Sequence, residues 1–110
     1  MGGGTYKVLE QVQAFNTAKA AGTTEQVIAG TQKSPYFNHL EILNNDAVDI
    51  VVTLDGQSTR KYIVPSKNGF TIDVSEGQKF LSISQTNNDS VTAETANTIL
   101  FKAMNKLQVG

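Results

Sequence analysis

The chain contains a single histidine, His39, so every reaction that needs an imidazole depends on this one side chain. Metal motifs that use two histidines are therefore excluded, and a Ser-His-acid arrangement would have to be built around His39. No Gly-x-Ser-x-Gly segment, which presents the nucleophilic serine of many hydrolases, occurs in the sequence. His39 follows Asn38 in a strand-like pattern, which favours an ordinary surface or edge histidine over a catalytic one.

Four aspartates in or beside expected turns are the other candidates for chemistry: Asp46, Asp49, Asp55 and Asp89. Carboxylate and carbonyl oxygens are the ligands of calcium, so such turns can in principle hold a cation. An EF-hand loop needs acids at alternate positions, a central glycine and a closing glutamate, and no segment of the chain has this pattern. Aspartate also accepts hydrogen bonds from the backbone of its own turn, and this is the interpretation we favour.

The remaining patterns also speak against catalysis. A carboxylate pair for glycoside cleavage would need a cleft, which nothing in the sequence indicates, and there is no tryptophan to form a sugar platform. Glycine-rich phosphate-binding motifs do not occur, and the absence of cysteine excludes thiolate sites and disulfides. We therefore expect a protein that is not an enzyme and has no catalytic residue, no cofactor and no metal ion.

One aromatic cluster is exposed according to the sequence pattern, at Pro35, Tyr36 and Phe37. Such a segment is more often a loop packed on a sheet edge than a platform for a ligand. If the domain binds a surface ligand, Tyr36 and Phe37 are the contact residues that the sequence offers.

Length and charge limit the partners. The 110 residues suit one domain with a real core, and charged residues make up only 17% of them, against roughly 25% in typical soluble domains. The net charge is -1 and the basic residues form no run, so we expect neither nucleic acid nor a membrane as a partner. The N-terminal residues do not have the basic and then apolar pattern of a signal peptide, and no apolar stretch is long enough to span a bilayer.

The N-terminal segment has two possible structures. Val8, Val12 and Phe15 recur at a helical spacing, with Leu9 beside them, which predicts a short amphipathic helix. Tyr6 and Val8 alternate with Lys7 and few capping residues are present, so an extended arm is equally compatible. We assign residues 1–22 to this arm or helix and residues 23–110 to a β domain.

Beyond residue 22 the apolar period becomes two, and turn residues recur at short intervals, as in β-sandwiches. The clearest strand is 47–54, where Val48, Ile50, Val52 and Leu54 share one face. Further strands are predicted at residues 25–31, 39–43, 60–64, 70–74, 79–85 and 98–104. This succession predicts a mostly β fold, with two antiparallel sheets in a sandwich or jelly-roll arrangement.

Two segments of the chain are similar to each other. Leu-x-Ile at 40–42 and again at 81–83 leads into Asn-Asn-Asp, at 44–46 and at 87–89. Two equivalent corners would explain the similarity. One copy of the sequence leaves open whether the halves arose by duplication or whether both corners simply use the turn preference of Asn and Asp.

The stretch 40–104 resembles small β-sandwich virion proteins of tailed bacteriophages. The residues that carry this resemblance are the Asn-Asn-Asp turn, the strand 48–56 ending in Asp-Gly, the Tyr-Ile-Val-Pro segment 62–65 and the strands 70–74 and 80–84. The resemblance implies a structural role in the virion, as a capsid decoration or cement protein or as another head or tail component. It assigns no functional residue.

An assembly role fits a nearly neutral domain without a catalytic set. We expect a homo-oligomer, with a trimer favoured, in which Val8, Leu9, Val12 and Phe15 contact a neighbouring copy, and in which other virion proteins such as a major capsid protein are further partners. The alternative is a carbohydrate-binding or host-surface-binding module that uses Tyr36 and Phe37.

Overall fold

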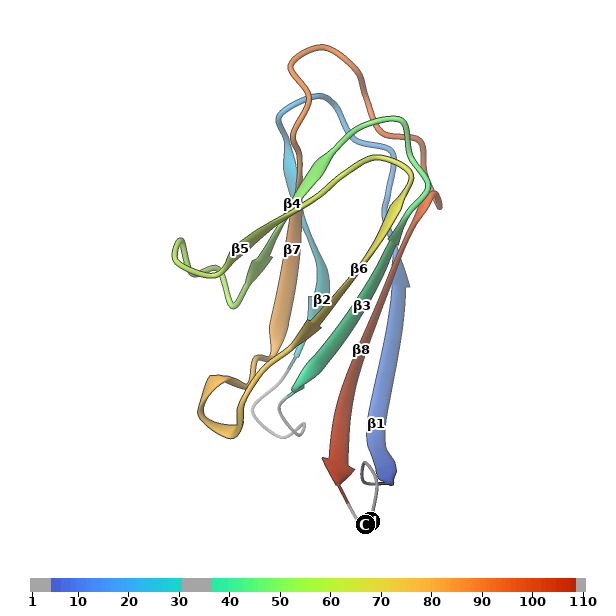
Figure 1. The fold of residues 1–110 in the computed structure, drawn as a ribbon. Coiled ribbons are helices and arrows are strands. Elements are labelled where there is room, and N and C mark those ends of the chain that lie inside the picture. The colour runs from blue at the N-terminus through green and yellow to red at the C-terminus, as the bar shows by residue number, and fades with distance from the viewer. Residues whose placement is uncertain (1–4, 31–36, 109–110) are drawn as a thin grey trace.

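The computed structural model describes residues 5–30 and 37–108, which form two four-stranded antiparallel sheets packed face to face (Figure 1). The predicted fold class is therefore confirmed. A short 3-10 helix, η1 (Glu76–Gln78), interrupts the strands. The described residues contain no helix that is long and apolar enough to cross a membrane. The strands are β1 (Tyr6–Phe15), β2 (Thr24–Ala29), β3 (His39–Asn44), β4 (Ile50–Leu54), β5 (Lys61–Val64), β6 (Asn68–Asp73), β7 (Ser82–Asn87) and β8 (Ile99–Gln108).

The strand order defines a jelly roll. One sheet has the order β1-β8-β3-β6 and the other β2-β7-β4-β5. The first strand therefore pairs with the last, the second with the seventh, the third with the sixth and the fourth with the fifth. This pattern is what results when one long antiparallel hairpin is rolled up into two sheets.

The core lies between the two sheets and follows from the alternation in the sequence. Val48, Ile50, Val52 and Leu54 are all buried, as their shared face predicts. The opposite sheet contributes side chains such as Phe101, which is also fully buried. Because successive residues of a strand point to opposite faces, each strand leaves its other side chains on the outside of the sandwich.

The N-terminal segment is not a helix. Residues 6–15 form strand β1, which pairs along its whole length with β8. A bulge between Val8 and Glu10 shifts the alternation by one residue, so apolar side chains that seem to follow a helical spacing lie on different faces of a strand. Val12 packs against the core, whereas Val8 and Phe15 are exposed.

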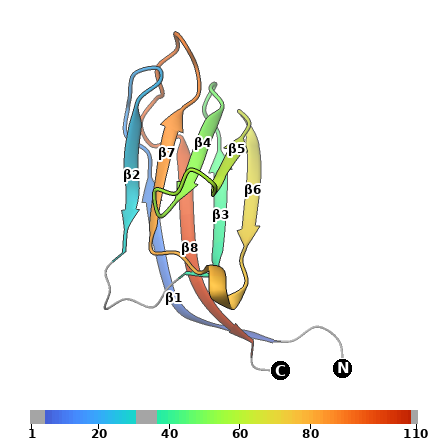
Figure 2. The same cartoon turned by 90° about the vertical axis from the view of Figure 1, so that its left-hand side faces the viewer.

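The paired ends of β1 and β8 extend beyond the other strands. Figure 2 shows the two strands curving together past the ends of their neighbours. The pairing of β8 with β3 reaches only from Ile99 to Met104, so among the described residues β1 alone pairs with the last part of β8. We call residues 6–10 and 105–108 the ribbon.

The two Asn-Asn-Asp segments form equivalent corners, as their similarity predicts. Asn44 and Asn87 are both fully buried at the end of a strand. The amide oxygen of each accepts a hydrogen bond from the backbone N–H two residues later, at 3.0 Å in both cases. The amide nitrogen of each donates to a backbone carbonyl further along, that of Val48 or of Thr92.

Candidate functional site

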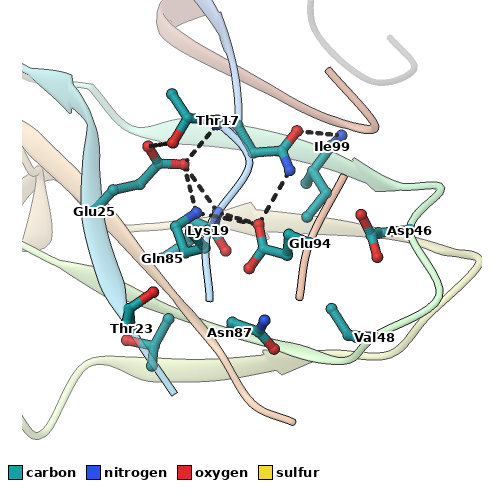
Figure 3. Close-up of polar contacts among 12 residues, drawn as sticks. Thr17, Lys19, Thr23, Glu25, Asp46, Val48, Gln85, Asn87, Glu94 and Ile99 are labelled. Carbon is teal, nitrogen blue, oxygen red and sulfur yellow. Dashed lines mark hydrogen bonds and ion pairs between the residues drawn. The ribbon is translucent and has the colours of Figure 1, made fainter. Parts of the chain in front are cut away.

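A buried cluster of polar side chains joins the two sheets at the end of the sandwich where the corners lie (Figure 3). At its centre is Lys19, from the β1–β2 connection, with a side chain that is only 7% exposed. Its ammonium group lies 2.6 Å from Glu25 on β2 and 3.1 Å from Glu94 in the β7–β8 connection. Two carboxylates thus face one cation.

Two amides complete this polar cluster. Gln85 on β7 donates from its amide nitrogen to Glu94 at 2.8 Å and to Glu25 at 3.1 Å. Asn16, which follows β1, donates to Glu94 at 3.0 Å, and its amide oxygen accepts the backbone N–H groups of Thr98 and Ile99. The cluster therefore ties together segments that are far apart in the sequence.

The hydrogen bonds of the cluster stabilise its charged carboxylates. Burial of Glu25 raises its pKa, but hydrogen bonds from Lys19, Thr17 and Gln85 outweigh this effect and lower the pKa from the usual 4.5 to about 2. Burial also raises the pKa of the nearby Asp46. Hydrogen bonds from the hydroxyl of Thr98 and from backbone N–H groups outweigh this effect, so the pKa of Asp46 is lowered as well. Both carboxylates are therefore ionised at neutral pH.

Removing one partner of a buried ion pair is strongly destabilising, so the pairs of Lys19 with Glu25 and Glu94 hold the connecting segments together. Among the described residues, the cluster contains no serine or cysteine nucleophile, and no group of three or more His, Cys, Asp or Glu side chains is placed to hold a metal ion. One oxygen each of Gln85 and Glu94 has no hydrogen-bond partner among the same residues. We interpret the polar cluster as a clamp between loops rather than as a catalytic site.

The four aspartates that sequence analysis raised as cation ligands are bound to backbone instead. Asp46 accepts the N–H groups of Ala47 and Thr95, and Asp89 accepts those of Val91 and Thr92. The remaining two behave in the same way: Asp49 accepts the N–H of Ser66, and Asp55 accepts those of Leu81 and Ser82. Asp89 binds the backbone of its own turn, as expected from the sequence, and Asp46 does so at Ala47. Asp49 and Asp55 instead bind backbone N–H groups of distant segments, so the expectation of local bonding is wrong for these two.

His39 is neither exposed nor on an edge strand, contrary to the sequence prediction. It lies on the central strand β3, and its side chain is buried on the outer face of the sheet. Its ring nitrogens lie 2.6 Å from Asp73 and 2.9 Å from Glu41. Because carboxylates occupy both nitrogens, neither is free to activate a hydroxyl group.

Only some of the predicted contact residues are exposed in the structure. Val8 and Leu9 are exposed on the ribbon, and Phe15 is exposed at the other end of β1, so these three are available to a partner while Val12 is not. Of the two predicted ligand contacts, Tyr36 lies outside the described residues. Phe37 is buried against Phe80, with ring centres 6.1 Å apart, and cannot contact a surface ligand.

An apolar row crosses the outer face of the sheet that contains β1. Phe15 pairs with Leu100, Leu100 with Leu43, and Leu43 with Gly69, in register across four strands. Gly69 has no side chain, and the surface beside it is hollowed into a shallow, open depression bordered by Glu41 and Lys102. The exposed part of this row, at Phe15 and Leu43, is apolar surface that a partner can contact.

A second, more polar hollow lies at the base of the ribbon. It is lined by Tyr6, Asn38, Asp73, Val74 and Lys106. The ammonium group of Lys106 sits over the ring of Tyr6, 4.9 Å from its centre. The sequence does not predict this hollow, because its residues come from four different segments and only the fold brings them together.

The described residues form a small jelly-roll domain with a buried polar cluster at one end and most of their exposed large apolar side chains on one sheet. Compared with known proteins, the chain matches no family model and no curated protein at a significant level.

Proposed function

We propose that this chain is a non-enzymatic structural protein of a bacteriophage virion, a capsid decoration or cement protein or another head or tail component, that works through contacts between its own copies and with other virion proteins. The jelly-roll strand order supports the proposal, because this architecture is shared by viral capsid domains, as well as by lectins and cupins. The sequence resemblance to phage virion proteins favours the first of these classes.

The observation that carries the proposal is the distribution of exposed apolar side chains. On the sheet that contains β1, large apolar side chains are exposed at Tyr6, Val8, Leu9, Phe15, Leu43 and Leu107. On the described part of the other sheet, only Ile63 is comparable. Exposed apolar side chains that are concentrated on one sheet of a domain are typical of a protein-binding region.

Self-association is the direct test of this proposal. We expect the purified protein to associate in a concentration-dependent way, and we expect substitution of Val8, Leu9 and Leu107 by serine to weaken that association roughly tenfold or more. Ile63→Ser, which removes an equally exposed side chain from the other sheet, is the matched control and should change nothing. Light scattering measures the mass of each variant, and circular dichroism checks that each is folded.

A carbohydrate-binding or host-surface-binding module is the second candidate, favoured by the hollow at Tyr6. An aromatic ring beside Asp73 and Lys106 offers a stacking surface with hydrogen-bonding groups around it. In that case a glycan array would show binding that Tyr6→Ala abolishes, whereas Phe70→Leu, inside the sandwich, would leave it intact. An array without any binding rejects this candidate.

A further inference from the structure

The ribbon carries several large apolar side chains that are exposed to solvent. Tyr6 is 56% exposed, Val8 46%, Leu9 49% and Leu107 48%. Two strands without a covering layer are at best marginally stable alone. These side chains therefore favour a structure in which something else covers the ribbon.

The two long edges of the ribbon differ. On the β8 side, the amide oxygen of Asn38 accepts the backbone N–H of Lys106 at 2.9 Å, and the amide nitrogen of Asn38 donates to the carbonyl of Lys106 at 2.8 Å. This side chain occupies the place of a neighbouring strand. On the other side, β1 ends the sheet and pairs with no further strand among the described residues. An open edge of this kind is a template for another strand.

The bulge in β1 sets up a complementary charge pattern along that open edge. Lys7 pairs with Leu107 and Glu10 pairs with Asn105, two positions apart on β8, so Lys7 and Glu10 lie on the same face of the sheet. Without the bulge, residues three apart would lie on opposite faces. Among the described residues, neither Lys7 nor Glu10 is in an ion pair.

We infer that the open edge of β1 pairs with β1 of a second copy of this chain, in antiparallel orientation about a two-fold axis; the inference rests on the proposed self-association. The register that sets Lys7 opposite Glu10 of the second copy also sets Val8 opposite Leu9 and Tyr6 opposite Gln11. Symmetry repeats each contact, so two opposite-charge pairs flank the axis. The same pairing brings Val8 and Leu9 of the two copies side by side and gives the open edge of β1 a strand partner.

Charge-swap variants test this register. Lys7→Glu places two glutamates opposite each other twice per pair of copies, and Glu10→Lys does the same with lysines, so each should weaken self-association roughly tenfold. The double variant Lys7→Glu with Glu10→Lys restores the opposite-charge pairs and should restore the association. Lys61→Glu, an equal change of charge at an exposed position of β5, should have no effect.

Sedimentation equilibrium gives the association constants, and circular dichroism confirms that each variant is folded. If a charge-swap variant does not fold, Lys7→Gln or Glu10→Gln replaces it. These neutral substitutions should weaken self-association less than the charge swaps. If the wild type associates but the single swaps leave its association unchanged, or the double variant fails to restore it, the inferred pairing is wrong while the proposed function stands. If the wild type is a monomer at every concentration, the proposed self-association fails, and this inference fails with it.

Discussion

At the scale of single residues, Glu25 shows how the polar cluster couples ionisation to folding. Its carboxylate accepts hydrogen bonds from Lys19, Gln85 and both the backbone and the hydroxyl of Thr17. These donors face a charged acceptor, which makes the bonds short and strong. Protonation of Glu25 would weaken all of them together.

The lowered pKa of Glu25 predicts a defined acid dependence of stability. The pKa of Glu25 is about 2 in the folded protein, whereas its usual value of 4.5 applies in the unfolded protein. Between pH 2 and pH 4.5 the folded state therefore binds fewer protons than the unfolded state. The charged carboxylate therefore contributes its full stabilisation above pH 4.5 and loses it as the pH falls to 2, a change of about 3 kcal/mol. The side chain is 19% exposed, so solvent screens this effect only in part.

The comparison of wild type with Glu25→Gln isolates this contribution. The difference between their free energies of unfolding, from urea titrations, should be largest near neutral pH and should shrink as the pH falls from 4.5 towards 2. Asp46 and Asp89 also have lowered pKa values, but they are present in both proteins and cancel in the difference. A difference that stays constant over this range would show that Glu25 is not held in its charged form.

At the scale of elements, the two Asn corners fix where strands end and the chain crosses between sheets. Asn44 lies at the end of β3 and Asn87 at the end of β7, and each accepts one backbone N–H. Asn87 donates to one backbone carbonyl, whereas Asn44 donates to three, those of Val48, Val64 and Pro65. A buried backbone group without a partner is costly, so the side chain that replaces the missing strand partner stabilises the corner.

Alanine substitution at either corner should therefore be destabilising. Asn44→Ala and Asn87→Ala each leave a buried carbonyl and a backbone N–H without their partner, and we expect a loss of about 2 kcal/mol in each case. Asn45→Ala and Asn88→Ala, at the exposed neighbouring positions, are matched controls and should cost under about 0.5 kcal/mol. Equal losses in corner and control variants, measured by urea unfolding, would contradict this role.

Strands were predictable where burial of one face gave a regular alternation of apolar and polar residues in the sequence. The alternation of Val48, Ile50, Val52 and Leu54 identified the buried face. The strand predicted at 47–54 begins only at Ile50, because residues 46–48 form the bend that follows Asn44. For the N-terminal segment the bulge at Val8 and Glu10 shifted the period, and the resulting spacing matched a helix as well as a strand. The strand predicted at 79–85 begins and ends later, at Ser82–Asn87. Before it, Phe80 forms an isolated bridge with Phe37, and the N–H of Leu81 binds the Asp55 carboxylate instead of a neighbouring strand.

The polar cluster could not be predicted because its members meet only in the folded chain. Asn16 and Glu94 are 78 residues apart, and no spacing rule connects them. One signal was present: Gln85 and Asn87 continue the inward-facing alternation that Ile83 begins, which marks polar residues in the interior. The same limit applies to the exposed row of Phe15, Leu100 and Leu43, which depends on the register between strands.

At the scale of the whole molecule, the two sheets differ in what they present to a partner. The molecule is elongated, 49 Å by 30 Å by 23 Å, with the ribbon at one end. One sheet holds most of the exposed apolar side chains and the open edge of β1, while the polar cluster stabilises the opposite end. Removal of residues 1–21 would strip β1 from its sheet, so point substitutions are the appropriate way to probe the interface.

The most direct test of the proposed assembly role is the solution mass of the wild-type protein, measured by light scattering over a wide range of concentration. The account predicts a mass that rises with concentration from 11.8 kDa to a multiple of that value. A mass of 11.8 kDa at every concentration would contradict it.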